Sequence, residues 1–160
     1  MVRKKVAALA FAAILVVAAT GYVFTAPYTR IAGVRIGGAM TTPPADFTIA
    51  FKPTIGLIKT GGFPPFVVHV VLVPFKSGFI TATRPDGGYW SKRARIAPDG
   101  YVRNGDTTFA MKATEVLGDE RLPYLRSWGG PDLDRRLSGG VIVGESEPLR
   151  EWQVFLWTPR

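Results

Sequence analysis

Two apolar runs dominate the hydrophobic pattern of the chain. The first, Val6 to Phe24, contains nineteen residues without a charge and follows Arg3, Lys4 and Lys5. As a helix this run would be about 28 Å long, which is near the thickness of the hydrocarbon core of a bilayer. The pattern predicts one N-terminal transmembrane helix. The basic cluster is expected to stay in the cytoplasm, which places the rest of the chain on the extracytoplasmic side.

A cleaved signal peptide is the alternative interpretation of the same stretch. Val17, Ala18 and Ala19 are small residues of the kind found at a cleavage site, although a secretory apolar region is usually shorter. The flanking cations and the extreme N-terminal position argue against a buried helix of a soluble domain. We therefore expect a membrane-anchored protein, with secretion after cleavage as the alternative.

The second apolar run, Phe66 to Phe75, is short and rich in β-branched residues. A strand this apolar is expected to be buried on both faces, inside a barrel or a sandwich. His69, the single histidine, lies within it and is expected to be a hydrogen-bonded core residue rather than a base. Residues 76–78 supply turn chemistry, so residues 79–84 are expected to return antiparallel to the first strand.

The remaining pattern predicts a mainly β (α+β) fold with two or three short helices. Further strands are expected at 46–52, 54–59, 100–105, 107–117 and 152–157, and helices at about 90–98, 119–128 and 131–137. Trp128, Trp152 and Trp157 are expected to lie in the core, as large aromatic residues of small β domains usually do.

The domain organisation follows from these elements. Residues 1–26 are the anchor or signal segment, and residues 27–44, with their Gly, Pro and Thr, form a linker. Residues 45–160 are long enough to build one hydrophobic core. We predict that they form a single β-barrel domain.

The net charge of +8 is distributed unevenly. Lys and Arg outnumber acids seven to one in residues 1–60 and six to two in residues 61–104, whereas acids outnumber them nine to seven in residues 105–160. The excess is a membrane-flanking cluster plus one local patch, without the basic stripe of a nucleic-acid-binding protein. The absence of Cys excludes disulfides, thiolate metal sites and Cys nucleophiles.

The local patch follows the strand expected at 79–84. Hydroxyl groups and cations are close in sequence where this strand gives way to a helix, and that combination suits a phosphate. The candidate residues are Thr81, Thr83, Arg84, Trp90, Ser91, Lys92, Arg93 and Arg95. The alternatives are a solvated helix face for the cations and the wet side of a sheet for the threonines.

Metal and hydrolytic sites find no support in the pattern. Asp86, Asp99 and Asp106 lie in expected turns, where Asp is common, and they make no ligand cluster with His69. Residues 144–147 lack the second glycine of a nucleophile elbow. We predict no catalytic side chain and no metal.

The order of elements resembles the pyridoxamine-phosphate-oxidase-like superfamily of FMN-binding split β-barrels and its deazaflavin-dependent nitroreductase relatives. In that superfamily a strand ends in threonine, a loop with Ser and Lys follows, and a helix runs into an acid-proline or amide-proline pair. Residues 79–83 and 91–99 follow this order, and Trp90 matches the Trp-containing helix of the deazaflavin branch. The resemblance covers residues 61–128 and, less closely, 150–159.

Two features depart from the superfamily pattern. Residues 85–88 lengthen the phosphate loop, and Asp99 follows Pro98 where an acidic or amide residue usually precedes the proline. Both departures concern the residues that would hold the phosphate.

The resemblance implies a split β-barrel that binds FMN or 8-hydroxy-5-deazaflavin through the eight candidate residues. Phe63, Phe66 or Trp90 would line the slot for the ring system, and the cofactor would pass hydride to or from a small acceptor such as a quinone or a nitro compound. The resemblance also implies a homodimer with the cofactor between subunits. The alternative function is a non-catalytic, membrane-anchored, extracytoplasmic β-barrel that binds a ligand or serves as a scaffold.

Overall fold

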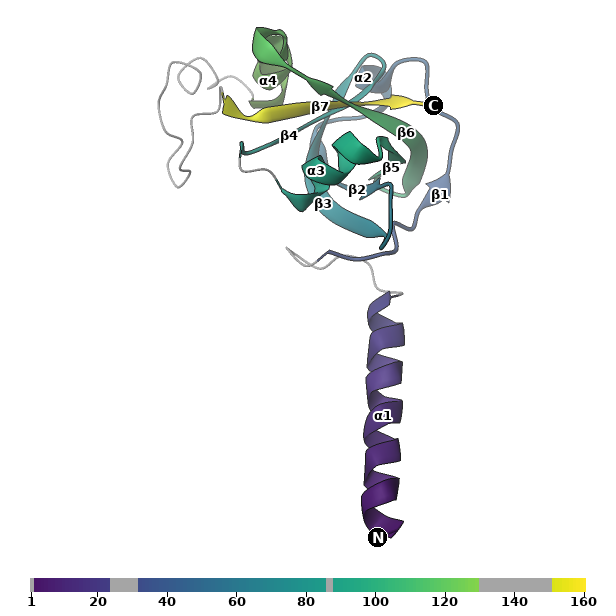
Figure 1. Cartoon of the computed structure of the whole chain (residues 1–160). Helices are drawn as coiled ribbons and strands as arrows, with labels where there is room; N and C mark the ends of the chain where they lie inside the picture. The colour runs from purple at the N-terminus through teal and green to yellow at the C-terminus, as the bar shows by residue number, and fades with distance from the viewer. Residues whose placement is uncertain (1, 24–31, 86–87, 130–150) are drawn as a thin grey trace.

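The computed structural model describes residues 2–23, 32–85, 88–129 and 151–160 of the 160-residue chain. Helix α1 (Val2–Val23) is followed, beyond the linker, by a β-rich domain (Figure 1). Residues 5–21 of the helix are all exposed. The helix includes the N-terminal cations, and its apolar part begins only at Val6. No helix in the described ranges is long and apolar enough to cross a membrane, so the predicted transmembrane helix is not supported.

Six strands form a closed barrel, which confirms the mainly β fold with short helices. They are β2 (Thr54–Thr60), β3 (Phe66–Phe75), β4 (Gly78–Thr83), β5 (Asp99–Asn104), β6 (Thr107–Val116) and β7 (Gln153–Pro159). Around the barrel the order is β6, β5, β2, β3, β4 and β7, and the pairing of β7 with β6 closes the ring. The short strand β1 (Ala39–Met40) adds to β6 in parallel.

The long strand β6 makes this closure by changing partners along its length. Residues 107–112 pair with β5, whereas residues 111–116 pair with β7, both antiparallel. Strand β3 changes partners in the same way, from β2 over residues 66–72 to β4 over residues 73–75. Two long bent strands therefore turn the sheet through enough angle to meet itself.

The short helices are α2 (Phe47–Ala50), α3 (Tyr89–Ile96), the 3-10 helix η1 (Gly118–Arg121) and α4 (Leu122–Gly129). The α3 and η1–α4 helices confirm the predictions at about 90–98 and 119–128, whereas the segment 131–137 lies outside the described residues. Strands β2 to β7 confirm the predicted strands from residue 54 onward, with ends that differ by at most two residues.

The strand predicted at 46–52 is wrong, because this segment contains α2. The carboxylate of Asp46 accepts hydrogen bonds from the backbone N–H of Thr48 at 2.8 Å and from its hydroxyl, and so caps the helix. Phe47 and Phe51, four residues apart, then reach the same side, with ring centroids 5.9 Å apart. The spacing that resembled strand alternation is the spacing of one helical turn.

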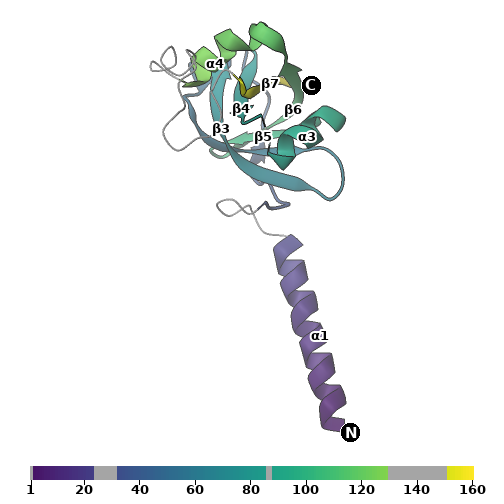
Figure 2. The same cartoon turned by 60° about the vertical axis from the view of Figure 1, so that its left-hand side comes forward.

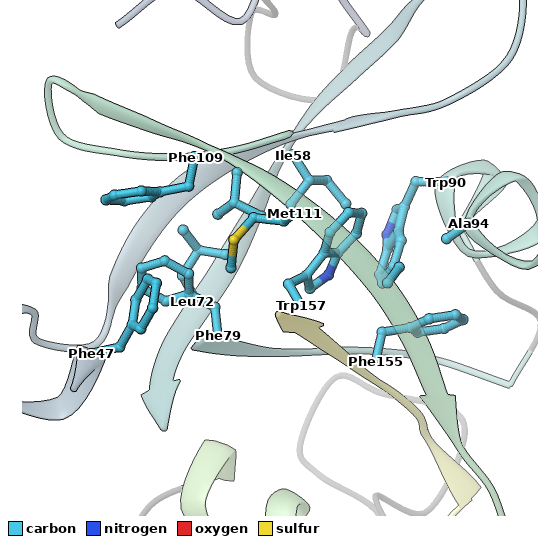
Figure 3. Packing of buried hydrophobic residues seen from close by; sticks show 12 residues of the cluster. Phe47, Ile58, Leu72, Phe79, Trp90, Ala94, Phe109, Met111, Phe155 and Trp157 are labelled. Atoms are coloured by element: carbon cyan, nitrogen blue, oxygen red, sulfur yellow. The ribbon is translucent and has the colours of Figure 1, made fainter. Parts of the chain in front are cut away.

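Two clusters of buried side chains stabilise the domain. The interior cluster fills the barrel, and α2 and α3 reach it from opposite sides with Phe47 and with Trp90 and Ala94 (Figure 3). The second cluster lies beneath α4 and includes Leu125 and Trp152. Helices α3 and α4 thus cover different parts of the barrel (Figure 2).

The predicted core tryptophans are confirmed. Trp157 belongs to the interior cluster, Trp152 to the second cluster, and Trp128 packs against Trp152 with ring centroids 5.4 Å apart.

One face of strand β3 is partly exposed to solvent, contrary to the prediction of burial on both faces. Phe66, Val68 and Val70 pack against the interior cluster, whereas His69 is exposed, so its predicted place in the core is wrong. Val67 is nevertheless fully buried on the outer side, because Gly33 pairs with it through two backbone hydrogen bonds of 2.9 and 2.8 Å. A covering segment from the predicted linker therefore accounts for part of the apolar run.

Candidate functional site

The two threonines proposed as phosphate ligands both accept hydrogen bonds within the protein. Thr81 is fully buried, and its hydroxyl accepts a hydrogen bond from Nε1 of Trp157 at 3.0 Å. The hydroxyl of Thr83 accepts from the backbone N–H of Gly88 at 3.3 Å, which ties the strand end to the start of α3. Both hydroxyls are engaged within the protein.

Trp90 and Ser91 face inward at the start of α3. The indole ring of Trp90 packs in the interior cluster at 5.1 Å from the ring of Phe155. The Ser91 hydroxyl is buried and donates to the carbonyl oxygen of Gly88 at 2.9 Å. These two side chains position α3 on the barrel.

Three of the predicted cations face away from the barrel interior. Arg84 and Lys92 are exposed. Arg95 reaches β6, where its guanidinium makes a two-pronged contact with the carboxylate of Glu115, with Nε 2.6 Å from Oε2. The hydrogen bond with Glu115 raises the pKa of Arg95 and outweighs the opposing effect of burial.

Arg93 differs from the other predicted cations, because only 9% of it is exposed. Its Nε donates to the hydroxyl of Thr60 at 3.3 Å, and its Nη2 donates to the carbonyl oxygens of Gly61 at 3.0 Å and Pro64 at 2.6 Å. The helix therefore holds the loop between β2 and β3 through this single side chain.

Two aromatic rings flank the Arg93 guanidinium. Its central carbon lies 5.7 Å from the ring centroid of Phe66 and 5.6 Å from that of Tyr89, within the range of cation–π attraction. The rings of Phe66 and Tyr89 also contact each other edge to face, at 4.9 Å. The guanidinium is thereby held in one orientation.

A pair of glycines lets the loop approach Arg93 closely. Gly62 has a positive φ of 87°, and a side chain there would meet Nη2 of Arg93 at 3.2 Å. A side chain at Gly61 would lie 2.7 Å from the carbonyl oxygen of Asp99. A side chain at Gly62 would therefore crowd the cation, and one at Gly61 would crowd the backbone of Asp99.

The positive charge of Arg93 has no acidic partner among the described residues. Its contacts there are carbonyl and hydroxyl oxygens and two rings, and its Nη1 donates to none of these residues. A buried cation is ordinarily paired with a carboxylate, as Arg95 is with Glu115. Among the described residues, the charge of Arg93 therefore has no carboxylate partner, and its Nη1 has no hydrogen-bond acceptor.

A cavity of about 210 Å³ borders this guanidinium, and we name it the Arg93 pocket. Its lining residues are Gly61, Gly62, Phe63, Tyr89, Arg93, Ile96 and Ala97. Apart from Arg93 and the hydroxyl-bearing Tyr89, the side chains of the lining residues are apolar. The volume is below the range of about 300–1,000 Å³ typical of drug-sized ligands, so the pocket fits a small molecule or one end of a larger one.

A larger cavity, of about 670 Å³, lies beside β6 and α4. It is lined by Thr114, Glu115, Val116, Leu117, Glu120, Pro123, Tyr124 and Leu156. The Glu115 carboxylate is engaged by Arg95, and the other lining carboxylate, Glu120, is exposed, so the cavity has no buried charge comparable to that of Arg93. The Arg93 pocket is therefore the better candidate site.

The eight predicted residues thus do not converge on one anion site. In a helix, successive side chains are about 100° apart, so Arg93 points toward the barrel, whereas Lys92 and Arg95, three residues apart, lie on the exposed side. Phe63, expected to line a ligand slot, does line the pocket, and Phe66 holds the cation. Tyr89 and Ile96 were missed, because nothing in their local sequence distinguishes a pocket wall from an ordinary helix surface.

Comparison by sequence identifies no relative: no protein family matches the chain, and no curated protein is similar to it.

Proposed function

We propose that this protein is a ligand-binding β-barrel whose Arg93 pocket binds the anionic group of a small ligand with an apolar body. The observation that supports the proposal is the buried Arg93 guanidinium, which borders a largely apolar cavity and has no acidic partner among the described residues. The function corresponds to the non-catalytic alternative derived from the sequence, narrowed to one site and one ligand chemistry.

The charge and the preorganisation of Arg93 both favour binding of an anion. A hydrogen bond that involves an ionised group contributes about 1.5–3 kcal/mol where water is excluded, roughly twice the value of a neutral one. Because three hydrogen bonds and two rings already fix the guanidinium, little side-chain entropy is lost when a ligand binds. Phe63 and Ile96 provide apolar surface for the body of the ligand.

Calorimetric titration of the purified full-length protein tests the proposal. Phenyl phosphate and benzoate are the anionic probes, and benzyl alcohol is the neutral probe of similar shape. We expect the anions to bind and the alcohol to bind at least about tenfold more weakly, a difference of about 1.4 kcal/mol. Equal affinities for the three probes would contradict the proposal.

A pair of substitutions at Ile96 avoids disturbing the fold, because this side chain is 85% exposed. Ile96→Glu places a carboxylate at the pocket and is expected to weaken anion binding about tenfold or more. Ile96→Gln is the matched neutral control and should change the affinity far less. If both variants bind the anions equally well, the ligand does not occupy this pocket.

A flavin or deazaflavin oxidoreductase is the second candidate function. Its support is that Arg93 and Phe63, both assigned to the cofactor by the resemblance, line one cavity. The cofactor would donate or accept the hydride, and the protein would hold one end of it. Titration with FMN and with riboflavin separates the candidates: binding of FMN alone favours a phosphate at Arg93, and binding of neither excludes the flavin function.

Placement and assembly are further proposals. The charge-flanked apolar sequence of α1 supports attachment to a membrane with the domain outside the cytoplasm, or secretion after cleavage. Fusions to reporter enzymes that are active on only one side of the membrane test the placement. The open side of the Arg93 pocket is compatible with the homodimer that the resemblance implies, which light scattering of the purified protein tests.

A further inference from the structure

The rim of the Arg93 pocket exposes large apolar side chains from two separate elements. Phe63, in the loop between β2 and β3, is 92% exposed, and Ile96, at the end of α3, is 85% exposed. Tyr89, at the start of α3, is also exposed, and all three line the same cavity. Single exposed apolar residues are common on protein surfaces, but three that meet at a candidate ligand site form a patch.

The segments that form this rim are positively charged. Residues 59–66 and 89–97 together contain four cations and no acidic residue. The cations are Lys59, Lys92, Arg93 and Arg95.

Acidic groups nearby neutralise only part of this charge. Glu115 pairs with Arg95, so that cation is compensated. The Asp99 carboxylate, on β5 just beyond the pocket, lies 3.5 Å from Arg160. Lys59, Lys92 and Arg93 therefore leave a net positive field around the apolar rim.

We propose that this rim docks onto an anionic lipid bilayer, with Phe63 and Ile96 inserted among the lipids and Lys59 and Lys92 close to the headgroups. Apolar tips flanked by cations and an aromatic ring are the chemistry of proteins that bind at the membrane interface. The partner must be anionic, because the rim segments contain only positive charges.

A protein partner fits the same surface less well. A specific protein interface buries about 800 Å² on each side, formed by some 20–30 residues, and its core is depleted in charge. The rim offers three apolar side chains among cations. A lipid surface needs no such area, since a few side chains can enter it independently.

Docking also suggests the source of the ligand. The anion that enters the Arg93 pocket would be a lipid headgroup phosphate or carboxylate, brought to the guanidinium when the rim inserts. This step rests on the proposed function, whereas docking of the rim does not. The two can therefore fail separately.

The absence of cysteine makes site-specific labelling direct. In the full-length protein, Ile96→Cys carries an environment-sensitive fluorophore at the rim. Ile49→Cys is the matched control, because Ile49 is 86% exposed on α2, away from the pocket. Vesicles of phosphatidylcholine are compared with vesicles that also contain phosphatidylglycerol.

We expect the label at position 96 to shift to the blue and to be quenched by brominated acyl chains in anionic vesicles, and the label at position 49 to remain in water. Combined Lys59→Ser and Lys92→Ser changes should lower the docked-to-undocked ratio about 30-fold. Identical signals from the two labels, or no preference for anionic lipid, would overturn the proposal. A shift that depends on protein concentration without lipid would instead assign the rim to a second copy.

Binding of phenyl phosphate to the same labelled protein tests the proposed anion-binding function separately from membrane docking. If the label at position 96 inserts and phenyl phosphate competes with the lipid headgroup for the Arg93 pocket, the pocket receives the lipid anion. Insertion without any binding of soluble anions overturns the headgroup assignment and leaves membrane docking intact. Binding of soluble anions without insertion overturns membrane docking and leaves the anion-binding function intact.

Discussion

Helices α2 and α3 cover the barrel interior from two sides, each with buried apolar side chains. On the α2 side, Phe47 inserts a fully buried ring that contacts Phe79 and Phe109 edge to face, at 5.0 and 5.5 Å. On the α3 side, Trp90 and Ala94 do the equivalent packing. The two sides show that covering the interior requires only apolar side chains.

The α3 side nevertheless contains a buried cation that the α2 side lacks. Arg93 binds three oxygens of the neighbouring segment yet has no carboxylate partner among the described residues. Burial of a charge without a carboxylate partner carries a desolvation penalty, which the hydrogen bonds and rings around Arg93 offset only in part. We interpret the difference as the mark of a ligand site.

The largest expected effect concerns the α2 side. Phe47→Ala removes a fully buried ring and should lower the free energy of unfolding by about 3–5 kcal/mol, measured by urea denaturation. Ile49→Ala, on the same helix but exposed, is the control and should change stability little. A small loss for Phe47→Ala would mean that α2 does not cover the interior as described.

A smaller loss of unfolding free energy is expected from a substitution on the α3 side. Arg93→Ala leaves the carbonyl oxygens of Gly61 and Pro64 without their donor, which should cost about 1–3 kcal/mol of unfolding free energy. The same change should abolish binding of phenyl phosphate. Lys92→Ala, its exposed neighbour, should alter stability by less than about 0.5 kcal/mol. If Arg93→Ala binds phenyl phosphate as well as the unmodified protein does, the α3 side does not contain the anion site.

The ion pair on the outside of α3 should contribute less again. Glu115→Gln breaks the contact with Arg95, whose side chain is 37% exposed, so solvent screening limits the expected loss to at most about 1 kcal/mol. A double-mutant cycle with Arg95→Gln measures the coupling. A coupling well above this limit would show that this partly exposed pair is more shielded than its exposure indicates.

The smallest effect is a pH dependence on the α2 side. Hydrogen bonds from the side chain and the backbone of Thr48 lower the pKa of Asp46 below 3.8. The ionised cap stabilises α2 above the unfolded pKa, and this contribution is lost as the pH falls through the lower folded pKa. Asp46→Asn keeps an acceptor without a titration, so its thermal midpoint should fall less between pH 5 and the acid range. If the thermal midpoints of the unmodified protein and of Asp46→Asn fall equally as the pH is lowered, Asp46 does not have this role.

Much of the barrel could be predicted from the sequence, because local alternation and turn residues report which segments form strands. Residues 76–78 and the apolar positions on either side predicted the β3–β4 hairpin. The same local evidence failed for residues 46–52, since Phe47 and Phe51 suit either a strand or a capped helical turn. It also failed for His69, which is exposed, whereas Val67 on the same face is buried because Gly33, far away in the chain, covers it.

The candidate site was harder to predict, because its geometry depends on contacts distant in sequence. The patch of cations was visible, but which one is buried depends on the rotation of α3 about its axis. That rotation is set by Trp90 and Ala94 packing on the barrel, and it places Arg93 opposite the loop at residues 61–64. The membership of the split-barrel superfamily and its flavin chemistry stay predictions.

The most direct measurement of the central claim is nitrogen-15 NMR of the arginine side chains during titration with phenyl phosphate. Arg93 and Arg95 lie two residues apart on one helix: Arg95 is paired with Glu115, whereas Arg93 has no acidic partner in the part of the chain that the structure describes. We predict that the Nε–H resonance of Arg93 shifts with saturation while that of Arg95 stays in place. An unmoved Arg93 resonance, or equal shifts of both, would contradict an anion site at Arg93.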